Sequence, residues 1–294
     1  MSDLVSKGTA LITGASTGIG AVYADRLAKR GHDLILVARN EAKLNVLSKR
    51  LTRQTGRSVK VLAADLNNRA DLTKVEATLR DDPSITMLVN NAGVAAVTPL
   101  LSSEIDKMED MIELNITALT RLTYAAAPAF VARGAGTIIN IASVVGISPE
   151  ALNGVYGATK AYVIAFSHSL QHELADKGIR IQAVLPGATA TDFWEKTGLP
   201  YQNLPESIVM SAEDMVDAAL VGLDRDELVT ILGLHNGDEW TCRRHAEYGA
   251  LSFGALLELC PETELDCVGR NSQRKVVDSW LRPRECKTMR PLVN

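Results

Sequence analysis

The chain lacks the features that would place it on nucleic acid, in a membrane or outside the cell. Its 294 residues carry a formal net charge of −4, and the absence of a basic stripe argues against nucleic acid as a partner. No uninterrupted apolar run approaches the ~18 residues of a membrane span. The start lacks the charged and apolar regions of a secretory signal. We therefore expect a cytoplasmic protein with no membrane partner.

Cysteine is missing from most of the chain, since all four cysteines fall between Cys242 and Cys286. Their spacings match neither a C-x₂-C zinc site nor a redox C-x-x-C pair. His168 and His172 are four residues apart, but Ser169 stands where a zinc-protease motif needs Glu. We predict no metal site and interpret the two histidines as surface or interface residues.

What the chain has instead is a regular alternation of apolar runs and helical patterns. About half of its residues are hydrophobic (46%), enough for a large core. The strand-like runs lie near residues 9–13, 33–38, 59–63, 85–89, 136–141, 179–184 and 228–232. The helical patterns lie near residues 18–30, 41–53, 69–80, 104–132, 155–177 and 211–224. This alternation predicts an α/β fold with a Rossmann-type, doubly wound sheet of about seven parallel strands flanked by helices.

The alternation stops near His235. No Pro/Gly-rich linker interrupts residues 1–235, which we predict to form a single domain. Residues 241–294 combine all the cysteines with scattered arginines and little periodicity. We interpret residues 236–294 as an atypical C-terminal extension. A poorly ordered tail and a replaced or frame-shifted ending over residues 241–294 are alternatives that the residues leave open.

A glycine-rich turn, Thr13–Gly20, follows the first strand-like run and opens a helix. The spacing is G-x-x-x-G-x-G rather than the commoner G-x-G-x-x-G. Gly14 would allow a tight turn, and Gly18 and Gly20 would let the backbone approach a pyrophosphate. The helix N-terminus adds unpaired N–H groups and a positive dipole. These features predict a nucleotide-binding turn.

The end of the second strand predicts which nucleotide. A carboxylate there would accept a hydrogen bond from the ribose 2′-OH, whereas Arg accommodates a 2′-phosphate. Ala38 occupies the acidic position, and Arg39 follows it. A guanidinium binds phosphate through two parallel hydrogen bonds. We therefore predict NADP(H) rather than NAD(H).

Ser143, Tyr156 and Lys160 form a Ser…Tyr-x-x-x-Lys pattern. Residues at i and i+4 share a helix face, so Lys160 would lie beside Tyr156. An adjacent ammonium lowers the pKa of a phenol, and a general acid or base works best with a pKa near the working pH. The spacing alone also describes a surface Tyr–Lys pair, so the other motifs must decide.

With these motifs in order from about residue 7 to 232, the chain resembles the short-chain dehydrogenase/reductase family. The resemblance implies that Asp65 and the following Leu66 contact the adenine. It also implies that the Asn90–Gly93 motif steadies the sheet beside the nicotinamide ribose. Ala38-Arg39, with no basic residue at Thr17, resembles the NADP-preferring members. The implied cofactor-binding residues are Gly14, Ser16, Thr17, Gly18, Ile19, Gly20, Arg39, Asp65, Leu66, Asn91, Ala92, Gly93, Tyr156, Lys160, Pro186, Gly187 and Thr191.

The resemblance also implies a catalytic group of Asn115, Ser143, Tyr156 and Lys160. Ser143 would hydrogen-bond the substrate oxygen, and Tyr156 would donate its proton as hydride reaches the carbonyl carbon. Lys160 would hold the ribose hydroxyls and lower the Tyr pKa. Asn115 would hold a water that connects Lys160 to solvent.

The substrate is expected to be a small carbonyl or alcohol compound. The apolar residues between Ala188 and Ser211 favour an apolar one, although that segment could equally pack on the core. Family members associate through the helices near 104–132 and 155–177, which implies a homodimer or homotetramer. A non-catalytic NADP(H)-sensing or binding protein on the same fold is the alternative.

Overall fold

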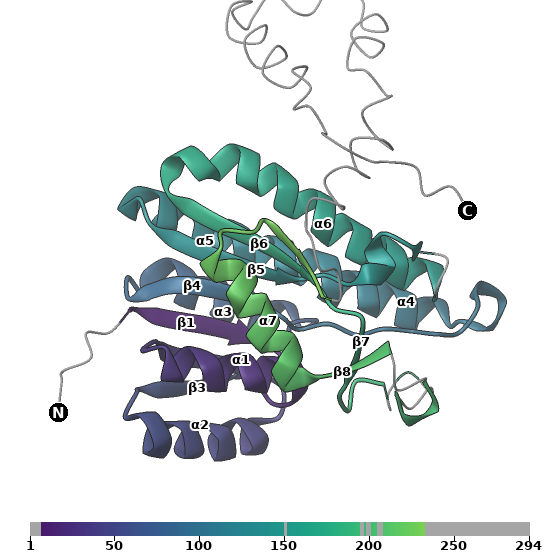
Figure 1. Ribbon diagram of the computed structural model, residues 1–294, viewed down its shortest axis with the longest axis horizontal. Coiled ribbons are helices and arrows are strands. Elements are labelled where there is room, and N and C mark those ends of the chain that lie inside the picture. Colours follow the sequence, from purple (N-terminus) through teal and green to yellow (C-terminus); the bar gives the residue numbers. More distant parts are fainter. Residues whose placement is uncertain (1–6, 150–151, 195–196, 198–200, 205–207, 233–294) are drawn as a thin grey trace, which may run out of the picture. The chain divides into compact units, whose positions relative to one another are not determined.

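The computed structural model describes residues 7–149, 152–194, 197, 201–204 and 208–232. Within these residues, seven parallel strands form one sheet in the order β3-β2-β1-β4-β5-β6-β9 (Figure 1). The strands are β1 (Thr9–Thr13), β2 (Asp33–Ala38), β3 (Val59–Ala63), β4 (Ile85–Asn90), β5 (Gly136–Ile141), β6 (Ile179–Leu185) and β9 (Val229–Ile231). The strand order reverses between β1 and β4, where doubly wound sheets bind ligands at the carboxyl ends. The predicted fold is confirmed.

The helices cover both faces of the sheet. They are α1 (Gly18–Lys29), α2 (Glu41–Thr55), α3 (Arg69–Asp81), α4 (Ile105–Ile112), α5 (Leu119–Arg133), α6 (Gly154–Leu174) and α7 (Ala212–Asp224). One buried cluster joins the sheet to α1, α2 and α7, and another joins it to α3, α5 and α6. Strands covered on both faces are buried throughout, as in β1, where all five residues are buried.

The helix predicted near 104–132 is not a single α-helix. A π-helical segment, Glu113–Ala118, lies between α4 and α5. Asn115 lies in this segment and is buried. Each π turn adds one residue to the α-helical repeat, and such turns are frequent at functional sites. The helix predicted near 155–177 also differs, because α6 ends at Leu174 and a 3₁₀ turn, Ala175–Lys177, follows.

A small second sheet lies outside the main one. β7 (Ala188–Ala190) and β8 (Val209–Ser211) pair in parallel, and β8 runs directly into α7 (Figure 1). Ser211 caps α7 by accepting a hydrogen bond from Asp214 N. The sequence did not predict this sheet, because strands of three residues show no alternation. It holds the segment after Pro186-Gly187 against the start of α7.

The described residues contain no helix that is both long and apolar enough to cross a membrane. The predicted extension 236–294, with all four cysteines, lies outside the described residues. The domain boundary at 235 therefore stays a prediction.

Candidate active site

A cleft of about 1270 Å³ lies at the carboxyl ends of the strands. The β1–α1 turn, the ends of β2, β3, β4 and β5, one face of α4, the start of α6 and the segment after β6 contribute to its wall. Among the predicted site residues, those on the wall are Gly14, Ser16, Thr17, Gly18, Ile19, Arg39, Asp65, Leu66, Asn91, Ala92, Gly93, Ser143, Tyr156, Lys160, Pro186, Gly187 and Thr191. Gly20 and Asn115 lie behind it. The structure therefore brings almost the whole predicted site together.

The glycine turn requires glycine for two different reasons. Gly14 has a φ of +65°, and a Cβ there would lie 2.8 Å from Asn91 Nδ2. A Cβ on Gly20 would collide with the Gly14 carbonyl oxygen and the Asn91 side chain. The structure thus shows that Gly20 lets α1 pack on the turn. The approach of a pyrophosphate to Gly20 stays a prediction.

The turn is braced by the end of β4. Asn91 Nδ2 donates to the carbonyl oxygens of Thr13 (2.8 Å) and Gly14 (3.2 Å). The Thr13 hydroxyl accepts from the backbone N–H groups of Asn91 (2.9 Å) and Ala92 (3.0 Å). The first turn of α1 has no acidic residue, and Thr17 makes no side-chain cap. The helix N-terminus thus has no anionic group of its own, which suits a bound phosphate.

Two cations lie at the end of β2. Arg39 is exposed and lines the cleft together with Lys43, which lies in the first turn of α2. Asn40 caps α2 by accepting a hydrogen bond from Lys43 N at 2.9 Å, which fixes the backbone of Lys43 at the start of the helix. The pair, with no carboxylate at Ala38, fits a ribose 2′-phosphate. The sequence analysis did not name Lys43, although Lys43 follows Arg39 by only four residues and lies in the first turn of the predicted helix.

The start of α6 presents the predicted catalytic pair, Tyr156 and Lys160. Asn153 caps the helix by accepting from the N–H groups of Val155 (2.9 Å) and Tyr156 (3.3 Å). Tyr156 and Lys160 are only 6% and 7% exposed. Lys160 Nζ donates to the Ile141 carbonyl oxygen (2.8 Å) and lies 5.9 Å from the centroid of the Tyr156 ring. The predicted shared helix face is confirmed.

Ser143 comes to the same place from the end of β5. Its hydroxyl donates to the Pro186 carbonyl oxygen (3.3 Å) and accepts from Val145 N (3.3 Å). It also lies close enough to the Tyr156 side chain to lower the pKa of the phenol. Ser143 therefore stands between the phenol and the Pro186-Gly187 segment.

Burial governs the ionisation of the pair. Burial raises the pKa of Tyr156 to about 12, although the nearby Ser143 hydroxyl opposes the rise. Burial also lowers the pKa of Lys160 to about 8. The sequence predicted a phenol pKa lowered by the adjacent ammonium, and this was wrong for the protein itself. Desolvation disfavours the charged form of both groups and dominates both shifts.

Asn115 lies behind the catalytic pair at 2% exposure. Its Nδ2 donates to the Val94 carbonyl oxygen (2.9 Å) and to Thr159 Oγ1 (3.1 Å), and its Oδ1 accepts from Val94 N (2.9 Å). The Thr159 hydroxyl in turn donates to the Tyr156 carbonyl oxygen at 2.8 Å. The amide therefore ties the π-helical segment to α6 and to the chain after Gly93. Its expected role in a water relay stays a prediction.

Comparison with known proteins agrees with this geometry. Residues 8–201 match the family described as short chain dehydrogenase. The chain belongs to the short-chain dehydrogenase family. A short-chain dehydrogenase from Sphingobium yanoikuyae, solved in complex with NADPH, is 48% identical, with a TM-score of 0.80 over 87% of this chain and 98% of that one. A bulky-bulky ketone specific alcohol dehydrogenase from Comamonas testosteroni is 43% identical, with a TM-score of 0.77 over 88% of this chain and 97% of that one.

An uncharacterized oxidoreductase of Staphylococcus epidermidis is also similar, at 33% identity over 212 residues, which is 70% of this chain and 90% of the relative. These relatives confirm the family and the enzyme class predicted from the sequence.

In this short-chain dehydrogenase, the wall beside the Tyr156 phenol is apolar. Met108 and Met111 of α4 are buried against Val145 and Tyr156, with Phe193 packed on the same cluster. The Phe193 ring lies 6.5 Å from the Tyr156 ring at an angle of 50°. Methionine adapts to irregular shapes, so this wall suits an apolar group. Sequence reasoning missed both methionines, because their spacing is also that of an ordinary core helix.

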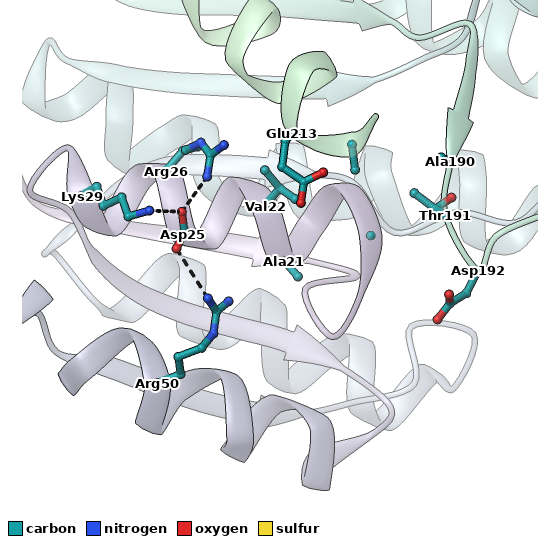
Figure 2. A pocket seen from close by; sticks show the side chains of 12 residues that line it. Ala21, Val22, Asp25, Arg26, Lys29, Arg50, Ala190, Thr191, Asp192 and Glu213 are labelled. Atoms are coloured by element: carbon teal, nitrogen blue, oxygen red, sulfur yellow. Dashed lines mark hydrogen bonds and ion pairs between the residues drawn. The ribbon is translucent and has the colours of Figure 1, made fainter. Parts of the chain in front are cut away.

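A second pocket, of about 470 Å³, lies against α1 and shares Gly18, Thr191 and Asp192 with the cleft. Figure 2 shows Asp25 on the side of the pocket away from Thr191 and Asp192, contacted by three cations. Asp25 Oδ2 lies 2.7 Å from both Arg26 Nη1 and Lys29 Nζ, and Oδ1 lies 3.7 Å from Arg50 Nη1.

These contacts decide the ionisation of Asp25. Burial pushes its pKa upward, but hydrogen bonds from Lys29 and Arg26 outweigh burial and hold the pKa below its usual value. Arg26 also binds Asp217 of α7 through two bonds of 2.7 and 2.9 Å. The cluster therefore fastens α1 to α7. Among the described residues, no three His, Cys, Asp or Glu side chains gather as a metal site.

Proposed function

We propose that this short-chain dehydrogenase uses NADP(H) to interconvert a bulky apolar ketone and its alcohol. The observation that carries the proposal is the meeting of Ser143, Tyr156 and Lys160 in one cleft, with an apolar wall beside the phenol. The glycine turn and the two cations at the end of β2 supply a place for a dinucleotide with a 2′-phosphate. The name of the Comamonas relative supports a bulky ketone, and the NADPH in the Sphingobium relative supports the cofactor.

The residues divide the chemistry among them. The nicotinamide, when bound, supplies or accepts the hydride at the substrate carbon. Ser143 holds the substrate oxygen, and the Tyr156 phenol gives that oxygen a proton as the carbonyl becomes an alcohol. In the reverse direction Tyr156 takes the hydroxyl proton back. Lys160 would hold the ribose hydroxyls of the bound cofactor and would favour the phenolate of Tyr156.

NADPH oxidation against ketones of graded size tests this function. Tyr156→Phe removes the proton donor but keeps the ring, so turnover should fall about a thousandfold, far more than binding of NADPH weakens. Tyr124→Phe is the matched control, because Tyr124 is 69% exposed on α5, away from the cleft. Near-normal turnover by Tyr156→Phe would refute the mechanism. NADPH binding without turnover of any ketone would support the alternative, a sensing or binding protein.

The cofactor preference has its own test. Arg39→Asp should repel the 2′-phosphate and shift the kcat/KM ratio from NADPH toward NADH by at least about tenfold, since a lost charged hydrogen bond is worth about 1.5–3 kcal/mol. Arg53→Asp places the same charge change on the exposed last turn of α2 and should leave the ratio unchanged. An unaltered ratio in Arg39→Asp would contradict the assignment.

The homo-oligomer and the cytoplasmic location remain part of the proposal. The large exposed side chain of Tyr124 on α5, stacked on Phe166 of α6, is compatible with helix packing against a second copy.

A further inference from the structure

A line of buried polar side chains runs along one face of the sheet and joins two helices that pack on that face. It runs from Thr123 on α5 through Asn90 on β4 and Asn140 on β5 to Ser167 on α6, and we refer to these four residues as the amide ladder. Asn90 is 4% exposed, and the other three are fully buried. Burying polar groups lowers stability unless they are hydrogen-bonded. Packing alone therefore does not explain why four polar side chains are buried together here.

The ladder is bonded from end to end. Asn90 Nδ2 donates to Thr123 Oγ1 (3.1 Å) and to Asn140 Oδ1 (3.0 Å). Asn140 Nδ2 donates to Ser167 Oγ (2.9 Å), and the Ser167 hydroxyl donates to the Val163 carbonyl oxygen (2.8 Å). Directional bonds thus connect α5, two central strands and α6.

The strand half of the ladder adjoins the site. Asn90 and Asn140 are register partners on β4 and β5. The residue after Asn140 is Ile141, whose carbonyl oxygen accepts a hydrogen bond of 2.8 Å from the Lys160 ammonium. A displacement of β5 against α6 would therefore change the distance that holds Lys160.

Ser167, the ladder residue on α6, also lies close to the site. Ser167 follows Lys160 by seven residues (167 − 160 = 7), which is two turns of α6. At about 100° per residue the two side chains lie within about 20° of each other around the helix. The Asn140–Ser167 bond and the Ile141–Lys160 bond therefore join the same strand to the same stripe of the same helix.

We propose that Asn140 and Ser167 are positioning residues for the reaction: they fix the rotation and height of α6 on β5, and so place Lys160 and Tyr156 in the cleft. The proposal rests on the proposed function. Apolar side chains of similar size would fill the same space, but they would allow α6 to rotate or slide. Catalytic groups need to be held to within about 0.5 Å, which directional bonds achieve.

The chain contains a matched control on the neighbouring strand. Gln182 of β6 is fully buried, and its Nε2 donates to the Ala219 carbonyl oxygen (2.8 Å) and to Thr230 Oγ1 (2.8 Å). It fastens α7 and β9 rather than α6. Loss of this buried amide should therefore lower stability without moving the catalytic pair.

Four variants test the proposal: Ser167→Ala, the milder Ser167→Cys, the conservative Ser167→Thr, and Gln182→Met. Urea unfolding measures stability, fluorescence titration measures the Kd for NADPH, and steady-state kinetics measure kcat and the pH profile of alcohol oxidation. Ser167→Ala should weaken NADPH binding and lower kcat by about tenfold each. The rising limb of its pH profile, which follows deprotonation of Tyr156, should move to higher pH, because a displaced Lys160 favours the phenolate less.

Ser167→Cys should show the same changes to a smaller degree, and so serves if Ser167→Ala does not fold. Ser167→Thr should restore the wild-type values, because its hydroxyl can accept the same bond. Gln182→Met should lose stability alone.

The proposal is overturned if Ser167→Ala and Ser167→Cys lose stability but keep the wild-type Kd, kcat and pH profile, since the ladder would then be structural only. It is also overturned if Gln182→Met changes these values as much as they do. If the wild-type protein binds NADPH but reduces no ketone, the proposed function fails. The Kd of the Ser167 variants then still decides whether the ladder positions Lys160.

Discussion

Asp25 and Lys160 are both buried ionisable side chains on the walls of neighbouring pockets, and the protein treats them in opposite ways. Asp25 is 6% exposed and has three cations around it. Lys160 is 7% exposed, and among the described residues no carboxylate forms an ion pair with it. The pKa of Asp25 is lowered, so its charge is stabilised. The pKa of Lys160 is lowered to about 8, so its charge is destabilised.

The difference separates a charge that is paired within the fold from one that we propose takes part in the chemistry. Asp25 organises α1, which carries the glycine turn, against α7 and α2. The Lys160 ammonium is destabilised by burial, so hydrogen bonds from a bound ligand would stabilise its charge more than they would stabilise the charge of Asp25. Perturbation toward the neutral form, inside a cleft and beside a second perturbed group, is typical of functional residues. Paired charges such as Asp25 are typical of structural ones.

The largest expected difference between Lys160 and Asp25 is in their effect on turnover. Lys160→Met keeps the volume of the side chain and removes the ammonium, so kcat for ketone reduction should fall at least about a hundredfold. The exposed Lys49 on α2 provides the control, and Lys49→Met should keep wild-type kcat. Retention of more than a tenth of wild-type kcat would mean that Lys160 resembles Asp25 in being structural.

The same variant should be more stable than the wild type at pH 7. The pKa of Lys160 is lowered from 10.5 to about 8 by burial, which corresponds to about 3 kcal/mol in the free energy of unfolding. Because the folded pKa lies below the unfolded one, the full cost is present below pH 8 and is relieved as the pH rises from 8 to 10.5. Urea unfolding at pH 7 and pH 9.5 should therefore show the advantage of Lys160→Met shrinking. A constant difference would contradict the assigned cause.

Asp25→Asn should have the opposite signature. It removes the charge that Arg26 and Lys29 contact, so the free energy of unfolding should fall by about 2 kcal/mol while kcat stays within about twofold. The loss should diminish in acid, because a carboxylate with a lowered pKa stabilises above its unfolded pKa and loses that effect as the pH falls through its folded pKa. Urea unfolding from pH 7 to pH 3 measures it. A large loss of kcat would place Asp25 in the catalytic machinery instead.

Arg50→Gln should have the smallest effect. Arg50 is half-exposed and approaches Asp25 only to 3.7 Å, and ion pairs of this kind contribute less than about 0.5 kcal/mol. Thermal unfolding in low and high salt should show almost no difference from the wild type. A loss as large as that of Asp25→Asn would show that all three cations are needed.

The sequence predicted the parts of the site that depend on local spacing. Tyr156 and Lys160 share a helix face because i and i+4 must do so, and the seven strands follow from the repeated apolar runs. The pKa of Tyr156 could not be predicted, because burial by Met108, Met111 and Phe193 is a tertiary property that outweighs the nearby ammonium.

Other features left no usable local pattern. The bond between Arg26 and Asp217 joins residues 191 apart in sequence, and three-residue strands such as β7 show no period. Lys43 was not predicted as a site residue, because it lies in the helix that follows the strand end rather than at the strand end itself.

The π-helical segment Glu113–Ala118 has a consequence for how this enzyme can change by mutation. One additional residue in a helix shifts the phase of everything before it by about 100° relative to everything after it. That shift lets α4 face the cleft with Met108 and Met111 while α5 faces the sheet with Leu122 and Ala126. Deletion of a single codon within this segment would restore a continuous α-helix and turn the methionines away from Tyr156. The reading frame of the gene would survive such a deletion, but the alignment of the substrate wall with the phenol would not.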